Sequence, residues 1–141
     1  MKAVLQRARH ASVTVDGKIV SSFQEQGIVA LVGATHSDSV QDVDLIVRKI
    51  AELRILDDEK SVQDVNAPVI VVSQFTLYAD VKKGRRPSWN GAAPQQIAQP
   101  LIDAVVHGLQ ERGINVGTGI FGAHMDVTFT NDGPVTIIVE T

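Results

Sequence analysis

The chain has 141 residues, a length typical of one domain, and we expect a single domain over residues 1–141. Its formal net charge of -3 argues against general electrostatic binding of nucleic acid, although a local basic patch is compatible with it. The absence of cysteine excludes disulfides, thiolate nucleophiles and cysteine metal sites.

The start of the chain predicts strands arranged around one tight turn. Segments 4–8 and 11–15 are short and β-branched, and the Asp-Gly pair at 16–17 is a strong hairpin signal. Residues 18–23 should therefore return antiparallel. The continuous apolar run 27–34 has the length of a strand, and we expect a central strand buried on both faces.

A first amphipathic helix is predicted next. Asp38 with Gln41 three residues later is a helix start signal, and apolar residues recur at helical spacing as far as Arg54. The acidic segment 57–60 predicts a solvated polar turn, with an acid pair for general acid–base chemistry as the alternative. Residues 69–72 predict a second buried strand.

A second helix is predicted from Pro94 to Arg112, because proline suits the first helical turn and Gly113 is a typical stop. Pro100 lies inside this span, so the helix either kinks there or begins near it. Residues 114–116 predict a short strand. We expect no membrane span, because the longest apolar run is far too short for one, and no signal peptide.

The segment 117–122 matches the pattern G-x-G-x-x-G, which binds dinucleotides only where it opens a helix. The residues after it alternate as a strand does, so nucleotide binding of this type is not expected. These glycines instead predict close packing of the backbone around a ligand or partner.

Two polar segments follow strand-like runs and are candidates for a site. Ser73–Thr76 ends the buried strand, and its alternative is a strand end whose hydroxyls are satisfied. In Asn131–Thr136 the local sequence favours a hairpin turn, with the proline at the start of the strand that follows. The alternative is that Gly133-Pro134 presents its backbone carbonyls to a ligand.

Residues 81–89 form a basic cluster with an aromatic residue beside it. The cluster contains four of the 13 Lys and Arg residues, and it either grips phosphates or is a solvated loop. The four histidines are not spaced as metal ligands, and no usual nucleophile–base motif is present. We therefore expect no metal and no cofactor, and chemistry that depends on backbone groups and on the substrate itself.

Taken together, these segments resemble the D-aminoacyl-tRNA deacylase family. Ser73–Thr76 and Asn131–Thr136 are similar to its two signature motifs, and the match runs in order over nearly the whole chain. The other matching segments are Val4–Arg7, Ala11–Val15, Leu31–Gly33, Lys83–Ser88 and Gly119–Met125. Two departures are a shorter segment at 57–64 and Trp89 in place of the more usual phenylalanine.

The resemblance implies an α+β fold in which layered, barrel-like β-sheets pack with two main helices, and a homodimer with sites at its interface. Ser73–Thr76 of one subunit would receive a cis Gly133-Pro134 from the other, and Arg7 would steady that dipeptide. The implied residues are Ser73, Gln74, Phe75 and Thr76 for catalysis; Arg7, Ala93, Met125, Asn131, Gly133 and Pro134 for substrate binding; and Lys82, Lys83, Arg85 and Arg86 for tRNA contacts.

The implied activity is hydrolysis of the ester that joins a D-amino acid to the 3′ end of tRNA, in the cytoplasm. D and L forms have the same groups and the same volume, so selection requires a rigid clash with one of them. Carbonyls of Gly133-Pro134 would form that wall, and glycine would slip past it. Phe75, Ala93 and Met125 would hold the adenosine.

For the chemical step, backbone N–H groups near Phe75 and Thr76 would bind the oxyanion, and the ribose 2′-hydroxyl of tRNA would activate the reaction. Two alternatives stay open. One is a non-catalytic module that binds RNA or tRNA, and the other is a small-molecule hydrolase or deaminase with clefts between subunits.

Overall fold

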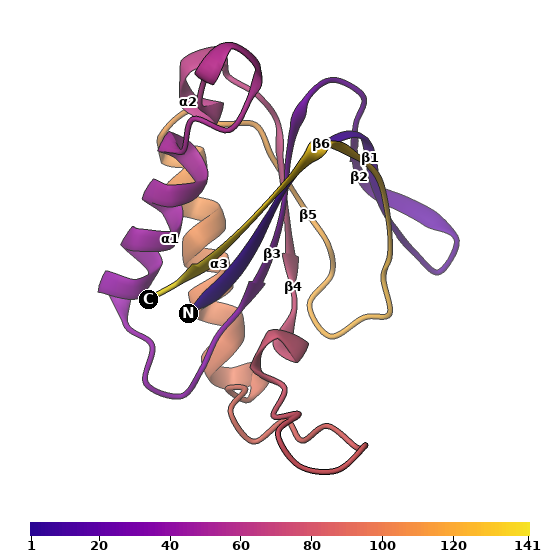
Figure 1. Cartoon of the computed structure of the whole chain (residues 1–141), viewed down its shortest axis with the longest axis vertical. Coiled ribbons are helices and arrows are strands. Elements are labelled where there is room, and N and C mark those ends of the chain that lie inside the picture. Colours follow the sequence, from indigo (N-terminus) through magenta and orange to yellow (C-terminus); the bar gives the residue numbers. More distant parts are fainter.

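The computed structural model describes residues 1–141, and its six strands form one mixed sheet (Figure 1). The strands are β1 (Lys2–Val15), β2 (Lys18–Phe23), β3 (Gly27–Gly33), β4 (Val69–Ser73), β5 (Val116–Thr118) and β6 (Asp126–Glu140). Their order is β2-β1-β3-β4-β5, and β6 pairs with β1. The pairs β3–β4 and β4–β5 are parallel, whereas β1 pairs antiparallel with β2, β3 and β6.

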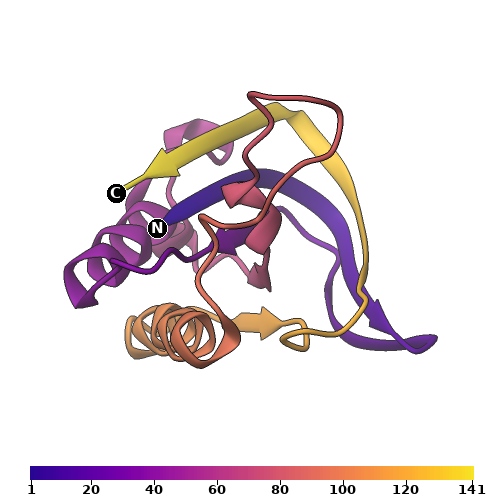
Figure 2. The ribbon, with the colours of Figure 1, turned by 90° about the horizontal axis from the view of Figure 1, so that it is seen from below.

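Two long helices and three short ones complete the chain. The helices are α1 (Val40–Glu52), α2 (Val62–Val65) and α3 (Gln95–Glu111), and the 3₁₀ turns are η1 (Asp57–Glu59) and η2 (Phe75–Tyr78). The expected α+β fold with two main helices is therefore confirmed. One sheet that curls strongly, rather than two separate sheets, produces the barrel-like layers (Figure 2).

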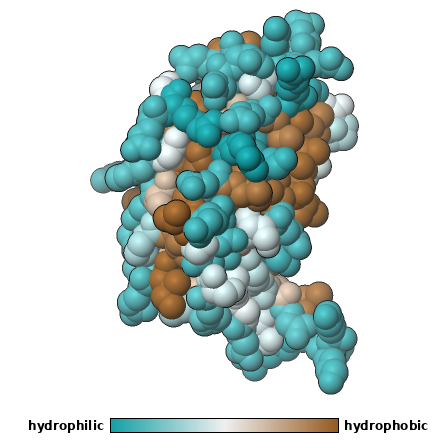
Figure 3. Space-filling view, turned by 90° about the vertical axis from the view of Figure 1, so that its left-hand side faces the viewer, coloured by the Kyte–Doolittle hydropathy of each residue, from teal (hydrophilic) through white to brown (hydrophobic).

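The curl divides the core in two. Alternate residues of β4 face opposite sides, so Val69 and Val71 pack in the larger core with α1 and α3. Ile70 and Val72 pack in a smaller core with residues of β1, β2, β3 and β6. The outer side of α1 is mostly hydrophilic with hydrophobic patches (Figure 3). None of the helices has both the length and the apolar character that a membrane span requires.

The predicted N-terminal hairpin is confirmed, with one change. Asp16 and Gly17 have φ angles of 49° and 74°, and β2 returns antiparallel to β1. The two short segments predicted before the turn are one continuous strand, β1, because β6 pairs along both of them. His10 has a φ of 52°, and the register with β6 shifts beside it. The predicted central strand is β3, with β1 and β4 as its neighbours.

The predicted first helix is present, but its cap lies one residue later than expected. Ser39 is the N-cap, and the carboxylate of Asp42 accepts hydrogen bonds from the Ser39 N–H and hydroxyl. Asp38 cannot serve as the cap, because its carboxylate is held by the Met1 amino group at 2.6 Å and by the Thr35 N–H at 2.7 Å.

The second predicted helix is α3, which begins after Pro94 and runs through Pro100. It ends before Gly113, whose φ of 78° stops the helix as expected. The short strand predicted at 114–116 lies at 116–118 instead, where it pairs with residues 69–71 of β4. No helix follows the glycines at 117–122, which agrees with the rejection of a dinucleotide site. Helix α2 was not predicted.

The hairpin turn predicted at Asn131–Thr136 is wrong. β6 continues through this segment and pairs with β1 on both sides of it. Asn131 lies opposite Ala8 and Thr136 opposite Gln6, so a step of five residues on β6 matches a step of two on β1. The surplus residues form a bulge, and the chain does not reverse, because both flanking runs share the same partner strand.

Candidate functional site

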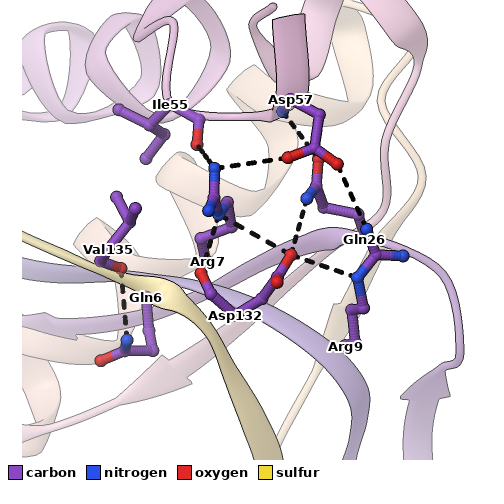
Figure 4. Close-up of polar contacts among 8 residues, drawn as sticks. All are labelled: Gln6, Arg7, Arg9, Gln26, Ile55, Asp57, Asp132 and Val135. Atoms are coloured by element: carbon purple, nitrogen blue, oxygen red, sulfur yellow. Dashed lines mark hydrogen bonds and ion pairs between the residues drawn. The ribbon is translucent and has the colours of Figure 1, made fainter. Parts of the chain in front are cut away.

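The bulge of β6 places Gly133 and Pro134 on the surface, and their peptide bond is cis, the isomer that the resemblance implies. Hydrogen bonds hold the two ends of the bulge. Arg7 Nε donates to the carbonyl of Asp132 at 2.8 Å, and Gln6 Nε2 donates to the carbonyl of Val135 at 3.2 Å (Figure 4). The exposed dipeptide is thus fastened on both sides by neighbouring residues of β1.

Gln6 acts on the C-terminal end of the bulge. The residue is 8% exposed, and a side-chain amide buried to this degree normally has hydrogen-bond partners. Besides donating to Val135, it accepts a hydrogen bond from the hydroxyl of Thr136 at 3.0 Å. The amide N–H and the amide oxygen thus each have a partner on β6, and these two hydrogen bonds fix the position of the bulge.

A network of charged and amide side chains acts on the N-terminal end (Figure 4). Asp132 Oδ2 accepts from Gln26 at 2.6 Å and from Arg9 at 3.2 Å. Asp57 lies 3.6 Å from Arg7 and 3.3 Å from Arg9, and its backbone N–H donates to Gln26. Arg7 also donates to the carbonyl of Ile55 at 3.1 Å.

This network, which we call the Arg7 clamp (Arg7, Arg9, Gln26, Asp57 and Asp132), joins β1 to η1 and to the bulge. Segment 57–60 is therefore neither a purely solvated turn nor an acid pair in isolation, because Asp57 pairs with both arginines. Sequence reasoning identified Arg7 but missed Arg9 and Gln26, and it considered Asp57 only as part of a solvated turn or an acid pair. Nothing in the local sequence signals that Gln26 would meet Asp132 of β6, or that Asp57 would meet Arg7 and Arg9 of β1.

The electrostatics of the clamp favour ionised Asp132. The hydrogen bond from Gln26, followed by the nearby charges of Arg9 and Arg7, lowers the pKa of this carboxyl below its usual value of 3.8. Asp132 is therefore charged at neutral pH and holds both arginines next to the bulge.

Gly133 has no room for a side chain. Its φ is 137°, a region that L residues rarely adopt, and a Cβ placed there would lie 2.7 Å from Arg7 Nη2. The packing of Arg7 against this glycine therefore excludes even alanine without a shift of the clamp. Asn131, at the other side of Asp132, is exposed and continues the pairing with β1.

The second candidate segment, Ser73–Thr76, lies at the end of β4 and in the first turn of η2. The Gln74 N–H donates to the carbonyl of Val32 at 2.8 Å, which ties the segment to β3. The Gln74 side-chain amide donates to the hydroxyl of Thr76 in a short hydrogen bond. No carboxylate or imidazole is hydrogen-bonded to Thr76, so its hydroxyl has no general base beside it.

Two backbone donors at the start of η2 are free. The first N–H groups of a 3₁₀ helix have no acceptor within it. The N–H of Leu77 bonds to the carbonyl of Gln74, whereas those of Phe75 and Thr76 have no acceptor in the protein. Two adjacent free donors of this kind are suited to bind an oxygen that carries developing negative charge.

A cavity of about 70 Å³ lies beside these donors. Ser73, Gln74, Phe75 and Ala93 line it, whereas Thr76 does not. Met125 does not line it: its sulfur packs over Gly119 beside the smaller core. Phe121, which was not selected from the sequence, lines the cavity instead.

The basic cluster lies in the loop after η2 and is exposed. The edge of Trp89 packs against Phe75, with ring centroids 5.3 Å apart, so this loop is joined to the cavity. None of its four cations forms a salt bridge within the protein: Lys82, Lys83, Arg85 and Arg86. A concentrated positive charge therefore remains available beside the site.

One chain does not bring the two candidate segments together. Ser73 pairs with Val32, which pairs with Ala3, whereas the bulge lies opposite Arg7, four residues further along β1. This offset is about 13 Å along the strands, and three strand spacings add about 14 Å across the sheet. Ser73 and Gly133 of one chain are therefore about 20 Å apart. The chain also has no cluster of residues that could hold a metal ion.

Comparison with known proteins gives a consistent result. The model of the family described as D-Tyr-tRNA(Tyr) deacylase matches residues 4–140. A D-aminoacyl-tRNA deacylase of Thermobifida fusca is 56% identical over 140 residues, which cover 99% of each chain. One of Beutenbergia cavernae is 57% identical over 140 residues, with the same coverage.

Two solved structures share the fold. The c-Myc DNA Unwinding Element Binding Protein is 39% identical, with a TM-score of 0.91, and the match covers 100% of this chain and 99% of the other. A structure described as that of a probable eukaryotic D-amino acid tRNA deacylase is 15% identical, with a TM-score of 0.79 and coverage of 98% and 97%. At this identity, the second likeness concerns the fold alone.

Proposed function

The chain belongs to the D-Tyr-tRNA(Tyr) deacylase family and is thus a D-aminoacyl-tRNA deacylase, an ester hydrolase, and we propose that it selects handedness with backbone groups and uses no side-chain nucleophile. The observation that carries the proposal is the pair of free N–H groups at Phe75 and Thr76, beside a hydroxyl that has no base. A site of this kind can bind an oxyanion, but it cannot generate an alkoxide.

In the proposed complex, the site combines two subunits. The Gly133-Pro134 bulge of one subunit lies against Ser73–Thr76 of the other, because the two segments are too far apart within one chain. The bulge suits this use, since it is exposed and yet fastened at both ends by Gln6 and Arg7. A wall that rejects one enantiomer must not yield, and these hydrogen bonds supply the rigidity.

The sheet offers a surface for the second copy. Val4 lies opposite Ile138 on β6 and opposite Leu31 on β3, so the three side chains form an apolar row on the face that the helices do not cover. Ile138 is 69% exposed. This apolar row reaches the edge strand β6 next to the bulge, which favours a partner that covers both the row and the bulge.

The chemical step follows from these groups. The ester carbonyl oxygen receives the N–H groups of Phe75 and Thr76, which stabilise the charge that develops as water attacks. The 2′-hydroxyl of the terminal ribose assists the attack, because the protein places no base beside the ester. The tetrahedral intermediate then expels the 3′-oxygen of the tRNA and releases the D-amino acid.

The tRNA end is held on two sides. Its terminal adenosine lies in the cavity of Phe75 and Ala93, and the basic loop contacts the phosphate backbone nearby. Because Phe75 packs on Trp89, binding of the acceptor stem by the loop and placement of the adenosine are coupled. We expect the protein to act in the cytoplasm, together with the translation machinery.

The direct test compares hydrolysis of D-Tyr-tRNA and L-Tyr-tRNA by the pure protein. We expect rapid release of D-tyrosine and negligible release of L-tyrosine. Equal rates would contradict the backbone wall. Tight tRNA binding without hydrolysis of either substrate would instead support a non-catalytic RNA-binding module, and hydrolysis of free D-tyrosine esters with no RNA would support a small-molecule hydrolase.

Glycyl-tRNA gives a second test of the same wall. Glycine has no side chain to clash with the carbonyls of Gly133-Pro134, so the proposal expects it to be hydrolysed while L-alanyl-tRNA is spared. The two substrates differ by one methyl group, and a difference in hydrophobic contact of that size would separate them by only about 1–3 kcal/mol. Measured discrimination far above that range supports a steric wall, and comparable rates on both would oppose it.

A further inference from the structure

A second cavity, of about 370 Å³, adjoins the one assigned to the adenosine. It lies between α3 and the edge of the sheet formed by β4 and β5, and the two cavities share Ser73, Ile102 and Phe121 as wall residues. Groups bound in the two cavities would therefore be neighbours. This is the relation between two consecutive nucleotides of one strand.

The lining of the larger cavity has two chemically distinct sides. The sheet side and part of α3 supply apolar side chains, including Val71 and Val116. The remainder of α3 supplies a polar edge of four residues at helical spacing: Gln99, Asp103, His107 and Gln110. An apolar floor with a polar edge suits a flat ring that has hydrogen-bonding groups on its rim.

The polar edge is also available. The side chains of Asp103, His107 and Gln110 form no hydrogen bond or ion pair within the protein. No lysine or arginine lines the cavity. A phosphate is therefore a poor occupant, because Asp103 would repel it and no lysine or arginine would compensate, whereas an uncharged base carries no such penalty.

We propose that this cavity binds the base of the nucleotide that precedes the terminal adenosine, and that Asp103 selects cytosine there. Every mature tRNA ends in C-C-A, so that base is a cytosine. A carboxylate accepts a hydrogen bond from the N4 amino group of cytosine, whereas uracil presents an oxygen at the same position. The glutamines on either side can pair with the other polar atoms of the ring. The inference rests on the proposed function, because it requires the adenosine in the smaller cavity.

The test uses three synthetic D-tyrosyl esters, of adenosine, of the dinucleotide CpA and of the dinucleotide UpA, together with D-Tyr-tRNA. For the native protein we expect kcat/KM to be about tenfold higher for CpA than for UpA, near the lower end of the range for a bidentate base contact, because Asp103 makes a single hydrogen bond to the base. The adenosine ester should be the poorest of the three. Asp103→Asn should reduce the CpA-to-UpA ratio to near one, mainly through KM, since the base lies away from the ester.

The matched control is Gln96→Ala, on the same helix but outside the cavity, paired with Gln110→Ala inside it. We expect Gln96→Ala to retain the native ratio and Gln110→Ala to lower it. Equal kcat/KM on CpA and UpA by the native protein overturns the inference, as does activity on D-Tyr-tRNA with none on any dinucleotide. Failure on D-Tyr-tRNA as well would instead overturn the proposed function.

Discussion

Gly133 is the residue at which backbone geometry and packing constrain the site most closely. Gly133→Ala should lower D-Tyr-tRNA hydrolysis by at least tenfold or weaken enantiomer selection, because the new Cβ would press on Arg7 Nη2. The rates on D and L substrates measure both effects. Gly17→Ala is the control, since Gly17 also has a positive φ, of 74°, but its Cβ would meet open space. Full rate with full selectivity in Gly133→Ala would contradict the backbone wall.

A substitution of Thr76 distinguishes a mechanism that uses backbone groups from one that uses a hydroxyl nucleophile. Its hydroxyl is bonded only to the amide of Gln74, so we expect Thr76→Ala to keep substantial activity, within about tenfold of the native kcat. Single-turnover kinetics on D-Tyr-tRNA measures this, with circular dichroism and oligomeric state as controls. Loss of all activity in a folded dimer would favour a hydroxyl nucleophile.

The carboxyl of Asp132 makes a pH-dependent contribution to the free energy of unfolding. Its pKa is lowered in the folded protein by Gln26, Arg9 and Arg7, so near pH 3.8 the unfolded chain binds more protons than the folded one. The stabilisation is therefore complete above that pH and is lost as the pH falls through the lower folded value. In thermal unfolding scans between pH 7 and pH 3, Asp132→Asn should show a smaller fall in Tm than the native protein. Parallel curves would refute this.

At the scale of elements, the Arg7 clamp connects η1 to the bulge. Asp57 is 63% exposed, so its ion pairs with Arg7 and Arg9 add little to global stability, roughly 0–1 kcal/mol. Their effect should instead be positional. Asp57→Asn should lower kcat by about two- to tenfold with little change in Tm, since a small displacement of the wall is costly.

The adjacent residue offers a control with the same chemistry. Asp58→Asn changes the same group in the same turn, but the side chain of Asp58 makes no ion pair. We expect native kinetics from it. Should both variants behave alike, η1 would act through its net charge and not through the clamp.

At the scale of the whole molecule, the proposed site requires two chains. Ile138→Asp should weaken the dimer and lower activity at low protein concentration, because a charge would replace an apolar side chain that is 69% exposed in one chain. Analytical ultracentrifugation and rates over a dilution series measure both effects. Val40→Asp, at a position 65% exposed on the outer side of α1, should change neither. A monomeric native protein with full activity would exclude the shared site.

Whether a segment's structure was predicted correctly depends on how far apart in the chain the residues lie that determine it. The turn at Asp16-Gly17, the strands β3 and β4 and the end of α3 at Gly113 were predictable, because each depends on residues within a few positions. The hairpin at Asn131–Thr136 was predicted wrongly for the same reason. Its local residues favour a turn, and only pairing of both flanks with β1 converts it into a bulge.

The sequence by itself determined the family, the two main helices, the two buried strands and the residues of both motifs, since these are recorded in local periodicity and in motif order. Only the tertiary structure decided that Gln26 contacts both Asp57 and Asp132, and that Phe121 rather than Met125 lines the cavity. It also decided that Ser73 and Gly133 of one chain lie far apart. The physical reason is that strand register and side-chain packing are set by partners up to more than a hundred residues away, as between Gln26 and Asp132, at a sequence separation of 106.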